Sequence, residues 1–281
     1  MSKSVMLRPS EVRSIVRLVG ECRDLGNDWW AWQRHCLDEL LKLTDSELSL
    51  SGEVGGVHHL DLTYLSPPVV LGVPGFVADP TRILETNYDH VVVNSASLFV
   101  SDYHARWVEE DGIAISNRDL YRDREWRASI DMQTIGEAAG VDASLLCCRE
   151  IHAAGAGIGL GEVQDVTLMR EKGKRAFNGR DCTIVREVVA ALTPLMGGPL
   201  ARFREPSPAD LPPRIRQVLT CFLEGDGDKQ VAARLGISIH TVNQYAKQIF
   251  KHFGVQSRTE LLARWIRRGW TTRGLDRPAG G

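Results

Sequence analysis

Polar side chains that could contact a nucleic acid recur on one face of a short segment. Asn243, Gln244, Lys247, Gln248 and Lys251 follow one another at spacings of one or three positions. On a helix such residues gather on one side, because each residue turns the chain by about 100°. Amide side chains can form paired hydrogen bonds with adenine, and lysine can bond guanine or a phosphate. The pattern therefore indicates contact with base edges and phosphates rather than bond-making chemistry.

Two predicted helices and a glycine turn position these side chains. A short helix is expected over Asp228–Leu235, and Gly236 can adopt the positive φ that ends it. Ser238 is a residue type that caps helix N-termini. A longer helix is expected over 239–253, where apolar residues recur at helical spacing. The pattern predicts a helix-turn-helix, whose second helix is expected to lie in the major groove of DNA.

Four further residues at the starts of the two helices complete the candidate DNA contacts: Lys229, Ser238, His240 and Thr241. Lys229, in the first helix, is expected to approach a phosphate. Thr241 could bond a phosphate through its hydroxyl or merely complete the first turn of its helix, and both interpretations remain open. Asn243, Gln244 and Lys247 are expected to reach base edges.

The segment Leu211–Arg268 matches a known pattern of residues without a gap. The matching residues are Pro213-Arg214, Val218-Leu219, Glu224-Gly225, Lys229, Val231-Ala232, Leu235-Gly236-Ile237-Ser238, Thr241-Val242, Ile249, Phe253-Gly254-Val255 and Ser257-Arg258-Thr259-Glu260-Leu261. On these residues the segment resembles the LuxR (GerE-type) helix-turn-helix, a four-helix DNA-binding domain of many bacterial regulators. Three positions depart from the family pattern: Ile215, where Glu is usual, Tyr245, where His is common, and His252, where Lys is common. The resemblance implies binding to double-stranded DNA and, since one domain covers a half-site, a homodimer on a palindromic site.

Charge divides the chain in the same place. Residues 211–268 hold ten Lys and Arg against four Asp and Glu, whereas residues 1–210 hold 22 against 31. A basic module joined to an acidic one is expected where only one part meets nucleic acid. We therefore expect a sensory or dimerisation domain over 1–200, a Pro-rich linker over 201–210, the DNA-binding domain over 211–268 and a flexible tail over 269–281.

The N-terminal region has the mixed pattern of an α+β domain. Helices are expected over 10–25, 28–43 and 180–196, the last capped by Asn178, and strands over 58–64, 144–148 and 163–169. Val91-Val92-Val93 also favours a strand, although the rest of 90–107 could be helical. Cys147-Cys148 is expected to be two alternating strand residues rather than a redox pair.

The segment 165–196 is similar to the end of the GAF/PAS-like sensor domains that precede this helix-turn-helix in many regulators. The resemblance implies an antiparallel sheet with flanking helices, followed by the all-α four-helix domain. It leaves the signal, a small molecule or a protein, open. An alternative is that residues 1–200 are an enzyme-like or protein-interaction module. A phosphorylated receiver domain is disfavoured because the first aspartate, Asp24, falls inside a helical pattern, and the Trp/Tyr/Asp spacing of acyl-homoserine-lactone sensors does not fit this sequence.

No spacing of residues indicates catalysis, a metal or a cofactor. The Gly-rich stretch 153–162 lacks the Lys-Ser/Thr of a phosphate loop. The six cysteines show no zinc spacing, and His58, His59 and His152 have no partner ligands at a useful distance along the chain. Because no signal peptide or membrane-spanning run is visible, a cytoplasmic protein is expected. Because no nucleophile–base constellation stands out, a non-enzymatic protein is expected.

Two amphipathic helices are expected to form the dimer surface. They cover Ser10–Leu25 and Arg180–Met196, and their apolar residues extend somewhat beyond one stripe. On this basis Val188→Asp is predicted to weaken the dimer.

Overall fold

A computed structural model describes residues 6–76, 80–151, 161–204, 206 and 210–267. The chain divides into two compact units, residues 1–203 and 204–281. We call them unit 1 and unit 2 and treat each by itself.

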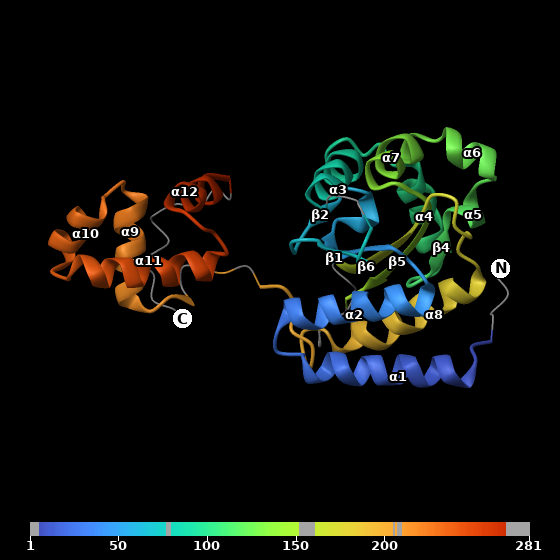
Figure 1. The fold of residues 1–281 in the computed structure, drawn as a ribbon, viewed down its shortest axis with the longest axis horizontal. Coiled ribbons are helices and arrows are strands. Elements are labelled where there is room, and N and C mark those ends of the chain that lie inside the picture. The colour runs from blue at the N-terminus through green and yellow to red at the C-terminus, as the bar shows by residue number, and fades with distance from the viewer. Residues whose placement is uncertain (1–5, 77–79, 152–160, 205, 207–209, 268–281) are drawn as a thin grey trace. The chain divides into compact units, whose positions relative to one another are not determined.

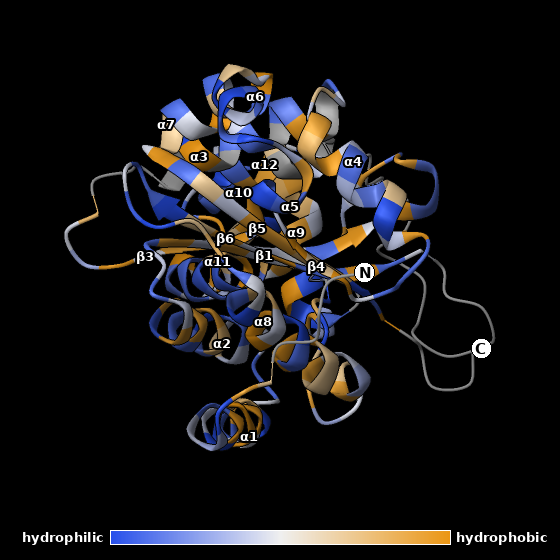
Figure 2. Ribbon diagram, turned by 90° about the vertical axis from the view of Figure 1, so that its right-hand side faces the viewer, coloured by the Kyte–Doolittle hydropathy of each residue, from blue (hydrophilic) through white to orange (hydrophobic). Residues whose placement is uncertain are grey.

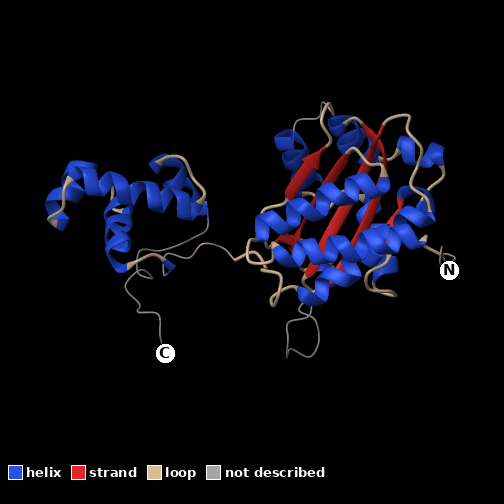
Figure 3. Cartoon of the chain, turned by 60° about the horizontal axis from the view of Figure 1, so that its bottom comes forward, coloured by secondary structure: helices blue, strands red, loops and turns tan. Residues whose placement is uncertain are grey.

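Unit 1 is an antiparallel sheet with helices on both faces (Figure 1, Figure 3). In the described part of the chain its strands lie in the order β2-β1-β6-β5-β4, and β3 also pairs with β1. The mixed α+β architecture expected from the sequence is confirmed. The strands are β1 (Leu48–Gly55), β2 (Thr63–Tyr64), β3 (Val69–Gly72), β4 (Ala114–Ser116), β5 (Val141–Glu150) and β6 (Val163–Glu171).

Three long helices cover one face of the sheet. They are α1 (Pro9–Asp24), α2 (Trp29–Thr44) and α8 (Gly179–Leu192), which the short helix η4 (Thr193–Leu195) extends. The α1 helix lies outermost, with α2 and α8 between it and the strands (Figure 1, Figure 2). Local signals fix these ends: Asp28 caps α2, and Asn178 caps α8 by accepting the N–H groups of Arg180 and Asp181 at 2.9 and 3.2 Å.

Shorter helices cover the other face. They are η1 (Val57–His59), α3 (Pro80–Asn87), η2 (Tyr88–Val93), α4 (Leu98–Trp107), α5 (Asn117–Leu120), α6 (Asp123–Ala128), η3 (Met132–Gly136) and α7 (Glu137–Ala139). Because both faces are covered, both sets of alternating side chains along β5 are buried. Leu145 and Cys147 join the core under α2 and α8, while Leu146 and Cys148 join the core on the opposite face. The two cysteines are alternating strand residues, as expected.

Two strand predictions are wrong. The expected strand over 58–64 is a single turn at Val57–His59 followed by the two-residue β2, and the valines after His90 lie in helical backbone. The strand β1 was not predicted from the sequence. Its alternate residues Ser49, Ser51 and Glu53 are polar yet buried, because they hydrogen-bond to neighbouring elements.

The predicted dimer surface on α8 is also wrong. Val185, Val188 and Val189 are buried and pack in the core between α8 and the sheet. The apolar face of α8 is wide because the core that it joins also contains residues of α1, α2 and the strands. On α1, by contrast, Val12 and Val16 are exposed.

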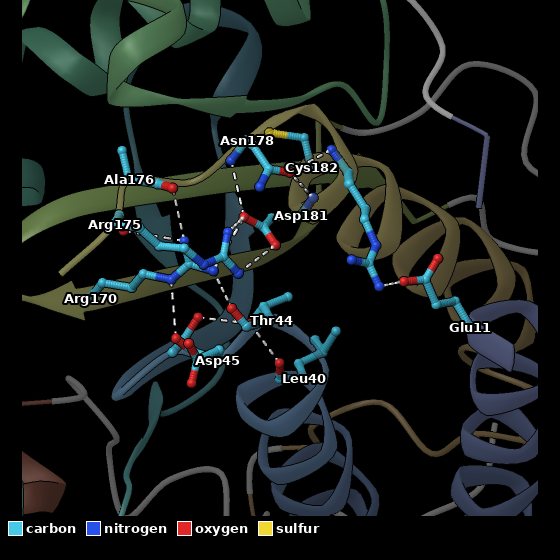
Figure 4. A network of polar contacts seen from close by, with 12 residues as sticks. Glu11, Leu40, Thr44, Asp45, Arg170, Arg175, Ala176, Asn178, Asp181 and Cys182 are labelled. Carbon is cyan, nitrogen blue, oxygen red and sulfur yellow. Dashed lines mark hydrogen bonds and ion pairs between the residues drawn. The ribbon is translucent and has the colours of Figure 1, made fainter. Parts of the chain in front are cut away.

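A buried arginine joins three elements of unit 1. Arg170, on β6, is fully buried, and its guanidinium donates to the carbonyl oxygens of Asp45 and Ala176 and to the carboxylate of Asp181 on α8, at 3.1, 3.0 and 3.2 Å (Figure 4). It also lies 4.1 Å from the ring centroid of Phe177. Burial lowers the pKa of Arg170, and the nearby Asp181 carboxylate opposes that shift. The network ties the end of α2 and the start of α8 to the sheet.

Unit 2 is all-helical. Its described helices are α9 (Pro213–Leu223), α10 (Asp228–Leu235), α11 (Ile239–Phe253) and α12 (Arg258–Arg267). They enclose one core, to which every helix contributes: Val218 and Phe222 from α9, Val231 from α10, Ile249 from α11 and Leu261 from α12.

Candidate functional site

The turn between α10 and α11 forms as the sequence predicts. Gly236 has φ +63°, and its N–H bonds the carbonyl oxygen of Ala232, which ends α10. The hydroxyl of Ser238 accepts the N–H of Thr241 at 3.0 Å and so caps α11. The hydroxyls of Ser238 and Thr241 also lie 2.8 Å apart. In this structure the Thr241 side chain is thus engaged at the helix start, which is one of the two roles considered for it.

One face of α11 presents the predicted contact residues to solvent: His240, Asn243, Gln244, Lys247, Gln248 and Lys251 are all exposed. The opposite face, with Val242, Ile249 and Phe253, is fully buried in the core of unit 2. Burial of this apolar face fixes the rotation of the helix and therefore the direction in which the polar row points.

Two members of the exposed row contact each other. The amide nitrogen of Gln244 lies 3.0 Å from Nε2 of His240, one helical turn earlier. Lys229, on α10, is exposed.

A shallow groove lies along part of the row. It is lined by Asp228, His240, Asn243, Gln244, Ala246, Lys247, Phe250 and Arg258.

Arg258 closes one wall of this groove, a role that its charge alone did not predict. Its guanidinium bonds the carboxylate of Asp228 and the carbonyl oxygen of Asp226, and it stacks 3.8 Å from the centroid of Phe222. It therefore joins the start of α12 to α9 and α10. We assign it a positioning role for the groove.

Residues 209–264 match the family described as "Bacterial regulatory proteins, luxR family". The chain carries a LuxR-type helix-turn-helix domain. The three departures from the family pattern do not disturb this LuxR-type core: Ile215 is buried in it, Tyr245 packs at its margin, and the ring of His252 lies edge-on to Phe253 at 4.8 Å.

Known relatives are similar to parts of the chain. Response regulator Rre1 of Synechocystis sp. is 33% identical over 89 residues, which are 31% of this chain and 38% of that protein. The chain thus spans well under half the length of that relative.

Two solved structures are also similar. SdiA in complex with octanoyl-rac-glycerol is 12% identical with a TM-score of 0.33, over 93% of this chain and 96% of that one. Escherichia coli SdiA is 14% identical with a TM-score of 0.28, over 86% of this chain and 98% of that one.

Unit 1 contains a cavity of about 110 Å³ on the sheet face opposite α2 and α8. Most of its lining is apolar, with Val54, Phe99 and Trp126 among the side chains. Two polar groups stand out in this lining. The carboxylate of Asp165 is buried and accepts the N–H of Gly52 at 2.6 Å. Nε2 of His104 is buried without a hydrogen-bond partner among the described residues.

Asp165 was missed at the sequence level. Its signal was an aspartate between Val163 and Val166 in a predicted strand, where a buried carboxylate is costly unless a partner satisfies it. Burial raises its pKa from the ordinary 3.8 to about 7, although the N–H of Gly52 opposes the shift.

This raised pKa predicts that stability depends on pH. The folded chain holds the Asp165 proton more tightly than the unfolded chain, so the stabilisation is complete below about pH 4 and is lost as the pH rises through about 7. Asp165→Asn cannot ionise. Between about pH 4 and about pH 8 we expect its stability to rise relative to that of the wild type by roughly 4 kcal/mol, since each tenfold change in proton affinity is worth about 1.4 kcal/mol. Urea unfolding followed by circular dichroism measures the difference.

The matched control for this prediction is Asp38→Asn, because the Asp38 side chain is 56% exposed. The stability of this variant relative to the wild type should not change comparably between about pH 4 and about pH 8. An Asp165→Asn advantage that stayed constant across this range would contradict the raised pKa.

A buried acid near the cavity has a structural role. The carboxylate of Asp131 accepts the N–H groups of Leu98 and Phe99 at 3.1 Å and so stabilises the start of α4. His90 and Ser97 both bond this carboxylate, at 3.1 and 2.5 Å. Asp131 therefore acts as a helix cap. The ring nitrogen of His90 contacts the Asp131 carboxylate and not the Ser97 hydroxyl, so these three residues are not arranged as a nucleophile with its base.

Within the described ranges, no group of three or more His, Cys, Asp or Glu side chains is arranged to hold a metal ion. No described helix is long and apolar enough to cross a membrane.

Proposed function

We propose that this chain is a sequence-specific DNA-binding transcription regulator whose α11 enters the major groove. The observation that carries the proposal is the exposed polar row of α11, held in fixed rotation by the buried face of the same helix. The row belongs to the part of the chain that matches the LuxR family. The proposal includes a cytoplasmic location and no enzymatic activity of unit 1.

The proposed contacts divide into two kinds. Asn243, Gln244 and Lys247 lie within the first turns of α11, where side chains of a recognition helix reach base edges. Lys229 and Lys251 would attract phosphates, one from α10 and the other a full turn beyond Lys247. Ser238, His240, Thr241 and Gln248 lie around Asn243, Gln244 and Lys247 and would contact the sugar-phosphate backbone.

Loss of a base contact and loss of a phosphate contact have different expected effects. Asn243→Ala and Lys247→Ala should each weaken binding to a preferred duplex by roughly 1–3 kcal/mol and relax the preference at one base pair. Lys251→Ala should weaken binding to all duplexes alike and lower the slope of log affinity against log salt by about one. Fluorescence anisotropy with a duplex selected from a random pool and with a scrambled duplex, at two salt concentrations, measures both effects.

The control is Gln217→Ala, an α9 substitution outside the groove. Discrimination lost in Lys251→Ala but kept in Asn243→Ala and Lys247→Ala would reverse the two roles. Affinity of the full chain that stayed flat from low to physiological salt would overturn the DNA-binding function itself.

We propose the cavity of unit 1 as the site at which a signal acts. A small, mostly apolar molecule suits its lining, and Asp165 and His104 supply polar groups that could orient such a molecule. A protein signal would have to act elsewhere, because the cavity lies inside unit 1.

A homodimer on a palindromic site also remains part of the proposal. Of the two helices expected to pair, only α1 offers exposed apolar side chains, namely Val12 and Val16. These two residues are one helical turn apart and so form a single ridge. We therefore assign the dimer surface to the outer face of α1.

A further inference from the structure

The last residues of unit 1 are held by a buried carboxylate on the sheet. Glu53, on β1, is 1% exposed. One of its oxygens accepts the backbone N–H of Phe203 at 2.7 Å and the indole N–H of Trp29 at 3.1 Å. The other accepts Nε of Arg202 at 2.8 Å. A single side chain therefore fixes both the backbone and the side chain of the segment at which unit 1 ends.

Further contacts reinforce this attachment. Arg202 also bonds the carboxylate of Glu162 at 2.8 Å, just before β6. Burial alone would lower the pKa of Arg202, but hydrogen bonds and attraction from Glu162 and Glu53 outweigh it and raise that pKa. The Phe203 ring packs 5.2 Å from that of Trp29. The side chain of Arg204, by contrast, is 85% exposed, so the attachment ends abruptly between residues 203 and 204.

The same stretch of β1 reaches the cavity. Side chains alternate between the faces of a strand, so Glu53 points toward α2 while Leu50 and Val54 line the cavity. Gly52, the residue before Glu53, donates its N–H to the cavity carboxylate of Asp165. Two adjacent residues of one strand thus bond the polar group of the cavity and the start of the interdomain linker.

We propose that Glu53 and Arg202 form a clasp on the start of the linker, and that the contents of the cavity act on this clasp through the hydrogen bond between Asp165 and Gly52. A ligand that draws the Asp165 carboxylate toward itself weakens its bond to Gly52. The Glu53 backbone keeps its bonds to Ser66 and Leu65 but loses the neighbouring anchor at Gly52, and the clasp opens more often. The regulatory half of this inference rests on the proposed signal site.

Brief trypsin digestion of the full chain tests the clasp. Trypsin cleaves after Arg202 only when the clasp is open, and an unstructured peptide added to the same digestion serves as the reference substrate. The ratio of nicks after Arg202, measured by intact mass, to cleavage of that peptide therefore reports clasp opening independently of protease activity. We expect Glu53→Gln to raise this ratio by about tenfold or more, since cleavage follows the population of the open form.

A second clasp variant guards against misfolding of Glu53→Gln. Arg202→Lys keeps the trypsin site and the charge, but one ammonium group cannot hold Nε and Nη contacts to two carboxylates. It should raise the ratio to an intermediate value while unit 1 keeps its melting temperature. An unchanged ratio in a folded Arg202→Lys chain would overturn the clasp.

The coupling is tested at about pH 8 with Asp165→Asn, which removes the charge from the bond to Gly52. The neutral amide costs less to bury, so unit 1 as a whole gains stability, but it accepts a weaker hydrogen bond from Gly52, since charge-assisted hydrogen bonds are the stronger ones. We therefore expect a local rise of roughly threefold or more in the digestion ratio. Thr167→Val is the matched control, because Thr167 lines the cavity without bonding β1 through its side chain in the described structure, and it should leave the ratio unchanged.

A wild-type ratio in Asp165→Asn, or an equal rise in Thr167→Val, would overturn the coupling. None of these digestions uses DNA. Failure of the chain to bind DNA would therefore defeat the proposed function without deciding the result for the clasp.

Discussion

Val188→Asp is expected to unfold unit 1 rather than to separate two intact copies of the chain. Val188 is fully buried in the core between α8 and the sheet. An ionised carboxylate at that position would have no partner, and burying such a group costs several kcal/mol. A typical domain is stable by only about 5–15 kcal/mol in total. Circular dichroism melting should show lost or strongly lowered cooperativity, with aggregation in light scattering.

Val16→Asp is the matched control, because Val16 lies on the outer face of α1 and is 67% exposed. It should keep the wild-type melting temperature within a few degrees. If the wild type is a dimer through α1, the mass of this variant in light scattering should fall by half. A Val188→Asp chain that melted normally at half the wild-type mass would contradict the packing of α8.

Asp181→Asn is expected to destabilise unit 1 by roughly 3–5 kcal/mol, the usual result of removing one partner from a buried ion pair. Arg170 is fully buried, and Asp181 is its carboxylate partner at 3.2 Å. The asparagine keeps the size of the side chain and can still accept the N–H of Asn178. The loss therefore isolates the charge. Urea unfolding at neutral pH measures it.

Asp123→Asn serves as the control for this prediction, since Asp123 pairs with Arg118 at the surface and its side chain is 58% exposed. Such exposed pairs contribute about 0–1 kcal/mol. Equal effects of Asp123→Asn and Asp181→Asn would show that the carbonyl partners of Arg170 suffice without the carboxylate.

Unit 2 could be predicted from the sequence almost element by element. Its signals are local: Gly236 supplies a positive φ, Ser238 caps the next helix, and the apolar residues of α11 recur on one face. The exposure of Asn243 and Lys247 follows from that periodicity. The sequence does not show which of these side chains contacts a base, because the folding of the chain itself does not depend on those contacts.

Unit 1 could be predicted only in outline, since its decisive interactions are distant in sequence. The sequence of β1 looks polar, and Ser51 and Glu53 can be buried only because they hydrogen-bond to partners more than a hundred residues away. The local sequence does not show those partners. The wide apolar face of α8 suggested a free surface, whereas Val188 is buried in a core that also contains residues of α1, α2 and the strands. The cavity acid Asp165 belongs to the same class, because its burial comes from helices that the local sequence does not specify.

The outer edge of β5 is closed by side chains rather than by a full-length neighbour. The strand β4 pairs with only three of its residues, Leu145, Leu146 and Cys147. Beyond that short pairing, other groups take the outward N–H donors: Asn117 accepts from Ser144 at 3.1 Å, Tyr103 from Cys148 at 2.7 Å and Asp111 from Glu150 at 2.9 Å. A strand from another molecule would find these donors already occupied. This edge of the sheet is thereby protected from the edge-to-edge growth that leads to amyloid-like aggregates.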